Sequence, residues 1–152
     1  MSKKAWLSCG GCLIAGLAIG YFGAMAKYGS TVANTLACLE MVDLGDSGNR
    51  AFQAYQHESI PVAIYSLSEY LDKLKAAEQA GATPFVSSQI LSIDMMLTHA
   101  RLAKLYGQTG QTNLSEQHFS EALDCAKADS KLTITNRDGL MDFVAKIDKG
   151  AK

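Results

Sequence analysis

The sequence predicts an all-α protein in which one N-terminal membrane helix precedes a small domain of packed helices. Only 2 of the 152 residues are proline, and apolar residues recur at helical spacing along most of the chain. The stretch Ala5–Ala26 carries no charge and lies between lysines. The remaining length fits one small domain. We therefore expect residues 1–28 to form the anchor and residues 29–152 to form the helical domain.

The uncharged stretch Ala5–Ala26 is long enough to cross a bilayer as a helix. At about 1.5 Å per residue, its 22 residues match a hydrocarbon core about 30 Å thick. Lys3 and Lys4 precede the stretch and only Lys27 follows it closely, which favours a cytoplasmic N-terminus. We expect a single-pass protein of the cell membrane whose helical domain lies on the extracytoplasmic (periplasmic) side.

A cleaved secretory signal is the alternative interpretation of the same stretch. Lys3 and Lys4 would form its basic region, Leu13–Gly23 its apolar core, and Ala24–Ala26 its small-x-small cleavage site. The protein would then be a secreted soluble helical domain released after Ala26. Both interpretations place the domain across the membrane.

Small residues recur at every fourth position of the predicted membrane helix and therefore share one face. Such a row lets another transmembrane helix approach closely, so it predicts packing against a partner helix. The high content of small residues in this stretch would also produce such a row by chance. Its members are Ser8, Cys12, Gly16, Gly20 and Ala24.

The first helix of the domain is expected from Thr31 to Leu44, after a joint at residues 28–30. Its apolar residues recur on one face, and Thr31 is a suitable N-cap. Residues 45–48 contain two glycines and are expected to end this helix. A shorter helix would then cover Asn49–His57.

Proline and glycine mark the ends of the next two expected helices. Pro61 suits a first helical turn because its missing N–H would have no partner there, and Gly81 ends the helix after Gln79. Thr83 and Pro84 are expected to begin the following helix. That helix is expected to end at residues 107–110, which again contain two glycines.

Capping pairs predict the last two helices. Asn113 with Glu116 begins a helix that continues to Ala128, and Thr135 with Asp138 begins the final one. The final helix is apolar on one side only. It would therefore close the open end of a stack of helices.

Between His99 and Leu123, large and small residues follow a fixed order on both sides of a glycine turn. The order is His99-x2-Leu102-Ala103-x2-Tyr106, then Gly110, then Ser115-x3-Phe119-x2-Ala122-Leu123. It resembles one tetratricopeptide (TPR) helical hairpin. The resemblance implies a hairpin core formed by Leu102, Ala103, Tyr106, Phe119, Ala122 and Leu123.

A fainter hairpin of the same kind lies upstream. Residues 50–54 would fill its first helix, and Ala63-x3-Leu67-x2-Tyr70-Leu71 its second. The resemblance therefore implies a short TPR-like α-solenoid of about two hairpins with a C-terminal capping helix. The basic and Asn side chains with which some TPR proteins clamp peptides are not recognisable, so no binding residue is assigned.

The sequence contains no pattern that predicts catalysis, a cofactor or a metal centre. His57, His99 and His118 are not paired at three- or four-residue spacing, and we expect His99 to pack inside the hairpin. Cys9 and Cys12 form a CxxC without the second ligand pair that a zinc site needs.

These observations favour a non-catalytic protein–protein interaction module anchored in the membrane. The alternative within the membrane is a structural accessory subunit of a larger complex, held by other transmembrane helices. The net charge of −1 becomes more negative without Lys3 and Lys4, which excludes a typical nucleic-acid-binding surface. No small-molecule substrate is evident.

Overall fold

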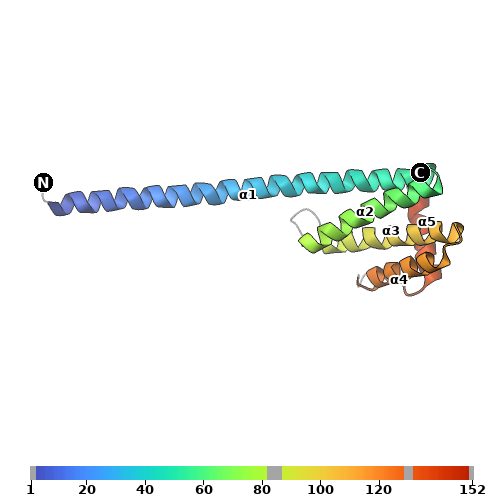
Figure 1. The fold of residues 1–152 in the computed structure, drawn as a ribbon. Helices are drawn as coiled ribbons and strands as arrows, with labels where there is room; N and C mark the ends of the chain where they lie inside the picture. The colour runs from blue at the N-terminus through green and yellow to red at the C-terminus, as the bar shows by residue number, and fades with distance from the viewer. Residues whose placement is uncertain (1–2, 82–86, 129–131, 151–152) are drawn as a thin grey trace. The chain divides into compact units, whose positions relative to one another are not determined.

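The computed structural model describes residues 3–81, 87–128 and 132–150, although the side chains of residues 3–23 and of Ala26 are not described. Every regular element in this part of the chain is a helix (Figure 1). The prediction of an all-α protein is confirmed. The helices are α1 (Lys3–His57), α2 (Ile60–Ala80), α3 (Ser88–Gln108), α4 (Thr112–Ala128) and α5 (Arg137–Gly150).

The chain divides into two compact units, Met1–Leu39 and Glu40–Lys152, and α1 contributes to both. Within the described part of the chain, no helix is long and apolar enough to cross a membrane. The predicted anchor lies almost wholly among the residues whose side chains are not described. The same holds for the small-residue row at Cys12, Gly16 and Gly20, whereas Ala24 is described and exposed.

The predicted breaks within α1 are wrong. The helix continues through the expected joint at residues 28–30 and through the glycine-containing residues 45–48. No described glycine in α1 has a positive φ, so neither Gly45 nor Gly48 uses the left-handed conformation that ends helices.

Contacts with α2 explain why residues 45–48 remain helical. Gly48 allows the Tyr70 ring to approach so closely that a Cβ at Gly48 would lie 2.8 Å from the ring Cζ. Lys73 donates to Ser47 Oγ at 2.7 Å and to Asp43 Oδ2 at 2.8 Å. These tertiary contacts outweigh the low helix propensity of glycine, which costs only about 1 kcal/mol per residue.

The second helix agrees with the prediction at both ends. Pro61 lies in its first turn, and Gly81 follows it with φ +89°. The third helix begins later than predicted, because the Ser87 side chain accepts a hydrogen bond from the backbone N–H of Ile90. The expected start at Thr83 and Pro84 lies outside the described residues.

The two predicted capping pairs near the C-terminus are wrong in detail. The fourth helix already includes Asn113, since it begins at Thr112. At the start of α5, Asn136 Oδ1 accepts a hydrogen bond from the backbone N–H of Gly139 at 2.8 Å. Asn136 therefore caps α5 in place of Thr135, and it satisfies a backbone donor that the first turn leaves free.

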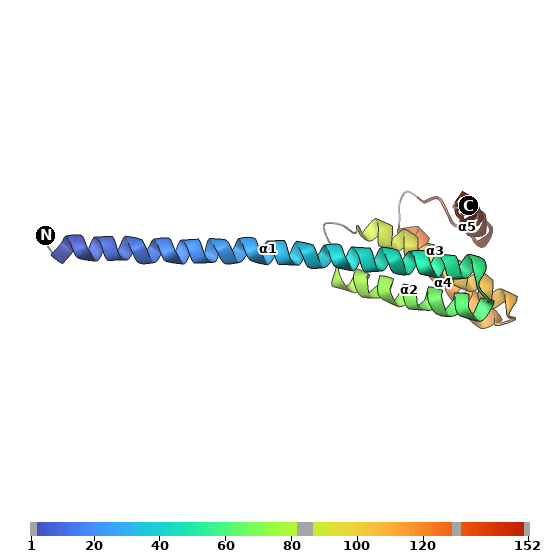
Figure 2. The same cartoon turned by 90° about the horizontal axis from the view of Figure 1, so that it is seen from above.

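The third helix lies between α2 and α4 in Figure 1, overlaps α4 in the view from above in Figure 2, and contributes to two apolar clusters. The first cluster joins α3 to α2 and to the C-terminal part of α1 around Leu67, Leu74 and Leu102. The second joins α3 to α4 and α5 around Met96, Phe119 and Leu140. Within Glu40–Lys152, α3 is thus the central helix, since it packs against α2, α4 and α5.

Candidate functional site

The predicted hairpin residues lie between α3 and α4. Ser115 Oγ donates to the carbonyl oxygen of Ala103 at 2.8 Å, and this buried hydrogen bond joins the two helices. The Tyr106 ring stacks on His118, with 5.4 Å between ring centroids and 2° between planes. Among the predicted core residues, Leu102, Ala103, Phe119 and Ala122 are buried, and Tyr106 and Leu123 are half-buried.

A cluster of three metal-ligand side chains lies in the same helix pair. His99 comes from α3, and His118 and Glu121 come from α4, one helical turn apart. The two Nδ1 atoms are 2.8 Å apart, and Glu121 Oε2 lies 3.0 Å from His99 Nδ1 and 3.3 Å from His118 Nδ1. Two imidazole nitrogens and one carboxylate oxygen therefore converge on one point. We call these three residues the His–His–Glu cluster.

Burial keeps both imidazoles neutral at neutral pH. It lowers the pKa of His99 to about 4, although the negative charge of Glu121 acts in the opposite direction. Burial also lowers the pKa of His118, again against Glu121. The positive charge of Lys75 on α2 lowers both pKa values further. Each neutral ring keeps one nitrogen lone pair for a proton donor or a metal ion.

His99 lies inside the hairpin as predicted, but the cluster was not predicted. Histidine spacing within one helix gives no sign of this site, because its histidines come from two helices. Two signals were present in the sequence. His118-x2-Glu121 has the spacing of neighbours on one helix face, and the hairpin resemblance places His99 on the facing helix.

An ion pair and a cation–π contact join α3 to α5 and to the C-terminal part of α1. Arg101 donates to Asp148 Oδ1 through Nη2 at 2.7 Å and through Nε at 3.2 Å, and both side chains are largely buried. The guanidinium carbon lies 4.6 Å from the centroid of the Phe52 ring. The third helix is thereby fastened to α5 and to the C-terminal part of α1.

A groove of about 510 Å³ lies beside this ion pair. It is lined by three alternate helices, α1, α3 and α5. Lys104 crosses part of it and donates to Tyr55 Oη at 2.9 Å. The lining residues are Tyr55, Gln56, His57, Lys104, Leu105, Gln108, Ala145, Asp148 and Lys149.

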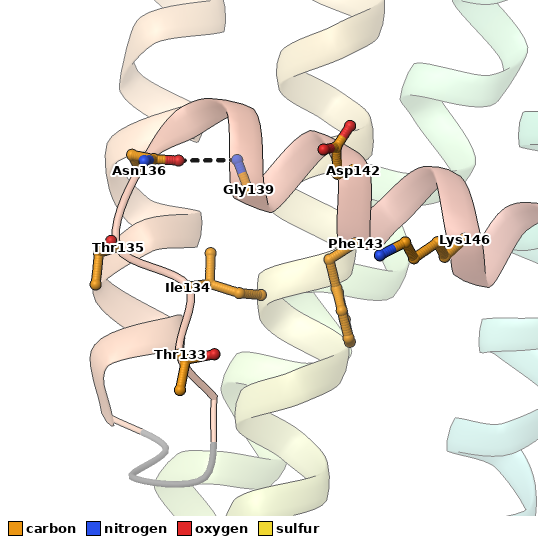
Figure 3. Close-up of a pocket in the computed structure, with 8 residues that line it drawn as sticks. All are labelled: Thr133, Ile134, Thr135, Asn136, Gly139, Asp142, Phe143 and Lys146. Atoms are coloured by element: carbon orange, nitrogen blue, oxygen red, sulfur yellow. Dashed lines mark hydrogen bonds between the residues drawn. The ribbon is translucent and has the colours of Figure 1, made fainter.

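A smaller pocket of about 330 Å³ lies at the start of α5 (Figure 3). Ile134 and Phe143 supply its apolar surface. Its two charged side chains, Asp142 and Lys146, lie one turn apart on α5, as in ordinary surface pairs. The pocket follows from the way the capped loop at Asn136 meets α5, and we assign it no binding role.

Comparison of the chain with protein-family models, with curated proteins and with solved structures gives no match.

Proposed function

We propose that the chain is a non-catalytic protein–protein interaction module, with a small TPR-like domain that is held at the membrane on its extracytoplasmic side. The observation that carries the proposal is the groove lined by α1, α3 and α5. In a stack of helical hairpins, the first helix of each hairpin faces the same side. Here α1 precedes α2, α3 precedes α4, and α5 follows as the cap. The lining by alternate helices supports a hairpin stack with one binding face.

The chemistry of the groove favours a polypeptide segment with acidic side chains. Lys104 and Lys149 contribute positive charge, whereas the carboxylate of Asp148 is already bound by Arg101. The Tyr55 ring adds apolar contact area, and the largely buried Leu105 side chain lies at the edge of the groove. Mixed aromatic, aliphatic and cationic linings of this kind suit a helix or an extended segment laid into a groove.

Two contacts connect the helices that line the groove. Arg101 connects α3 to Asp148 of α5, and it stacks on Phe52 of α1. These contacts hold the three lining helices in one arrangement before a partner arrives. A preformed surface loses less conformational entropy on binding.

Site-specific photo-crosslinking tests the proposal. A photoreactive amino acid at Gln108, inside the groove, is expected to capture one discrete protein in cells. The same residue at Ser120, exposed on α4 and outside the groove, is the matched control. Equal capture from both positions, or none from Gln108, would contradict the proposal.

The proposed membrane attachment rests on the uncharged stretch Ala5–Ala26 and on the lysines around it. To test the membrane attachment, a washed membrane pellet is extracted with detergent and the intact mass of the chain is measured. A full-length chain in the pellet is expected. A soluble chain beginning at Lys27 would instead identify a secreted domain.

Protease added to spheroplasts tests the proposed topology. It is expected to digest the helical domain, and protection of the domain would reverse the topology.

A further inference from the structure

We propose that His99, His118 and Glu121 bind a zinc ion that fastens α3 to α4. The carrying observation is geometric: three ligand atoms from two helices lie 2.8 to 3.3 Å from one another. Ligand atoms of a tetrahedral zinc ion, bound at about 2.0–2.1 Å, lie about 3.3 Å apart. The cluster therefore needs only small side-chain movements to close around the ion.

The ligand set selects the class of metal. Two imidazole nitrogens and one carboxylate oxygen suit zinc and similar divalent transition metals. Calcium and magnesium instead prefer oxygen ligands alone. Three protein ligands leave a fourth position for water. The charge of Glu121 offsets half of the charge of a divalent cation, and Lys75 on the exposed side of α2 opposes binding through its own charge.

The surrounding hairpin holds the ligands in place before the metal arrives. His99 is buried, with 3% of its surface exposed, and the His118 ring is fixed against Tyr106 by stacking. His118 and Glu121 project from adjacent turns of one helix. Each neutral ring offers one nitrogen lone pair, and the proton that lies between the two Nδ1 atoms must leave when both of them bind zinc.

Direct hydrogen bonding within the cluster is the competing explanation. One Nδ1–H can lie between the rings or point to the Glu121 carboxylate, which holds the three side chains together without a metal. The two explanations differ in one measurable respect. Only a metal site gives saturable zinc binding that depends on these three residues.

Zinc titration of the chelator-stripped full-length chain in detergent tests the proposal, with a chromophoric chelator as competitor. We expect one zinc ion to depend on this cluster, with binding weakened more than tenfold in His118→Ala and in Glu121→Gln. His57→Ala removes an exposed histidine outside the cluster and is the matched control, expected to bind as the wild type does. Glu121→Gln keeps the size of the side chain and one acceptor oxygen but removes the negative charge, so it tests the ligand even if His118→Ala unfolds.

Cobalt substitution excludes binding by the cysteines. Cys125 lies one turn beyond Glu121 on α4, and thiolates bind zinc tightly. Cobalt at the proposed site is expected to give visible ligand-field bands without a sulfur charge-transfer band, and Glu121→Gln is expected to remove them. Zinc binding that is absent, that survives both variants, or that shows sulfur ligation in cobalt spectra would overturn the proposal.

Discussion

His99 of α3 and His118 of α4 face each other across the hairpin, with their Nδ1 atoms 2.8 Å apart. The residues are separated by 19 positions in the sequence, and the antiparallel pairing of α3 and α4 brings them together. Glu121 completes the contact from the same face of α4. Burial lowers the pKa of both imidazoles, so the stability of the hairpin is expected to depend on pH.

The stability of the metal-free protein should fall as the pH falls from about 6.5 to about 4. An unfolded imidazole takes up a proton below about 6.5, whereas buried His99 resists protonation until about 4. The unfolded state therefore binds more protons across this window and gains relative stability. Thermal melting followed by circular dichroism in EDTA at pH 7 and pH 4.5 measures the effect.

The control for this prediction is a comparison of two histidine variants. His99→Asn should reduce the loss of melting temperature between the two pH values, because it removes the buried imidazole. His57→Asn should keep the full loss, since His57 is exposed. Identical pH dependence in His99→Asn and the wild type would show that His99 does not cause the effect.

Phe119→Ala should destabilise the domain by about 3–5 kcal/mol, because it leaves a cavity between α3, α4 and α5. Phe119 is 5% exposed and belongs to the second apolar cluster. Leu114→Ala, on the same helix but 38% exposed, should cost much less. Urea unfolding measures both values, and equal costs would contradict the assigned hairpin core.

Alanine substitutions at Gly45 and Gly48 of α1 should have opposite effects on the stability of the domain. Gly45 faces open space, so Gly45→Ala should stabilise the helix by about 0.5–1 kcal/mol. Gly48→Ala should destabilise it, because the new Cβ would displace Tyr70 from its hydrogen bond to Asp94. Stabilisation by both substitutions, in the same unfolding assay, would contradict the packing of α1 on α2.

Removal of the buried ion pair between α3 and α5 should also destabilise the domain. Asp148→Ala leaves Arg101 without its partner and should cost about 1.5–3 kcal/mol. Asp124→Ala breaks an exposed pair with Lys127 and should cost less than about 1 kcal/mol. Similar melting temperatures for the two variants would show that Arg101 does not hold α5.

The sequence predicts the helical domain well where local signals and tertiary contacts agree. Pro61 and Gly81 mark α2 because both act through the backbone alone. Gly45 and Gly48 misled the prediction, since α2 supplies a ring and an ammonium group that favour continued helix there. Such contacts depend on how α1 and α2 pack together and leave no local signal in the sequence.

The candidate sites also differ in how far the sequence predicts them. The resemblance to a TPR hairpin implies the hairpin core, and that resemblance rests on the order of residues within α3 and α4. The His–His–Glu cluster and the bond between Arg101 and Asp148 depend on which faces of different helices meet. Pairing of that kind is set by the packed fold, so periodicity within one helix does not predict it.

Charge reversal in the groove is the most direct test of the proposed interaction function. Lys104→Glu inverts one cation that lines the groove, whereas Lys127→Glu inverts an exposed cation at the end of α4. Photo-crosslinking yield from Gln108 is measured in both variants, after circular dichroism has shown that they fold. The account predicts at least a tenfold loss of yield in Lys104→Glu and none in Lys127→Glu. An unchanged yield in Lys104→Glu would contradict binding of an acidic partner in this groove.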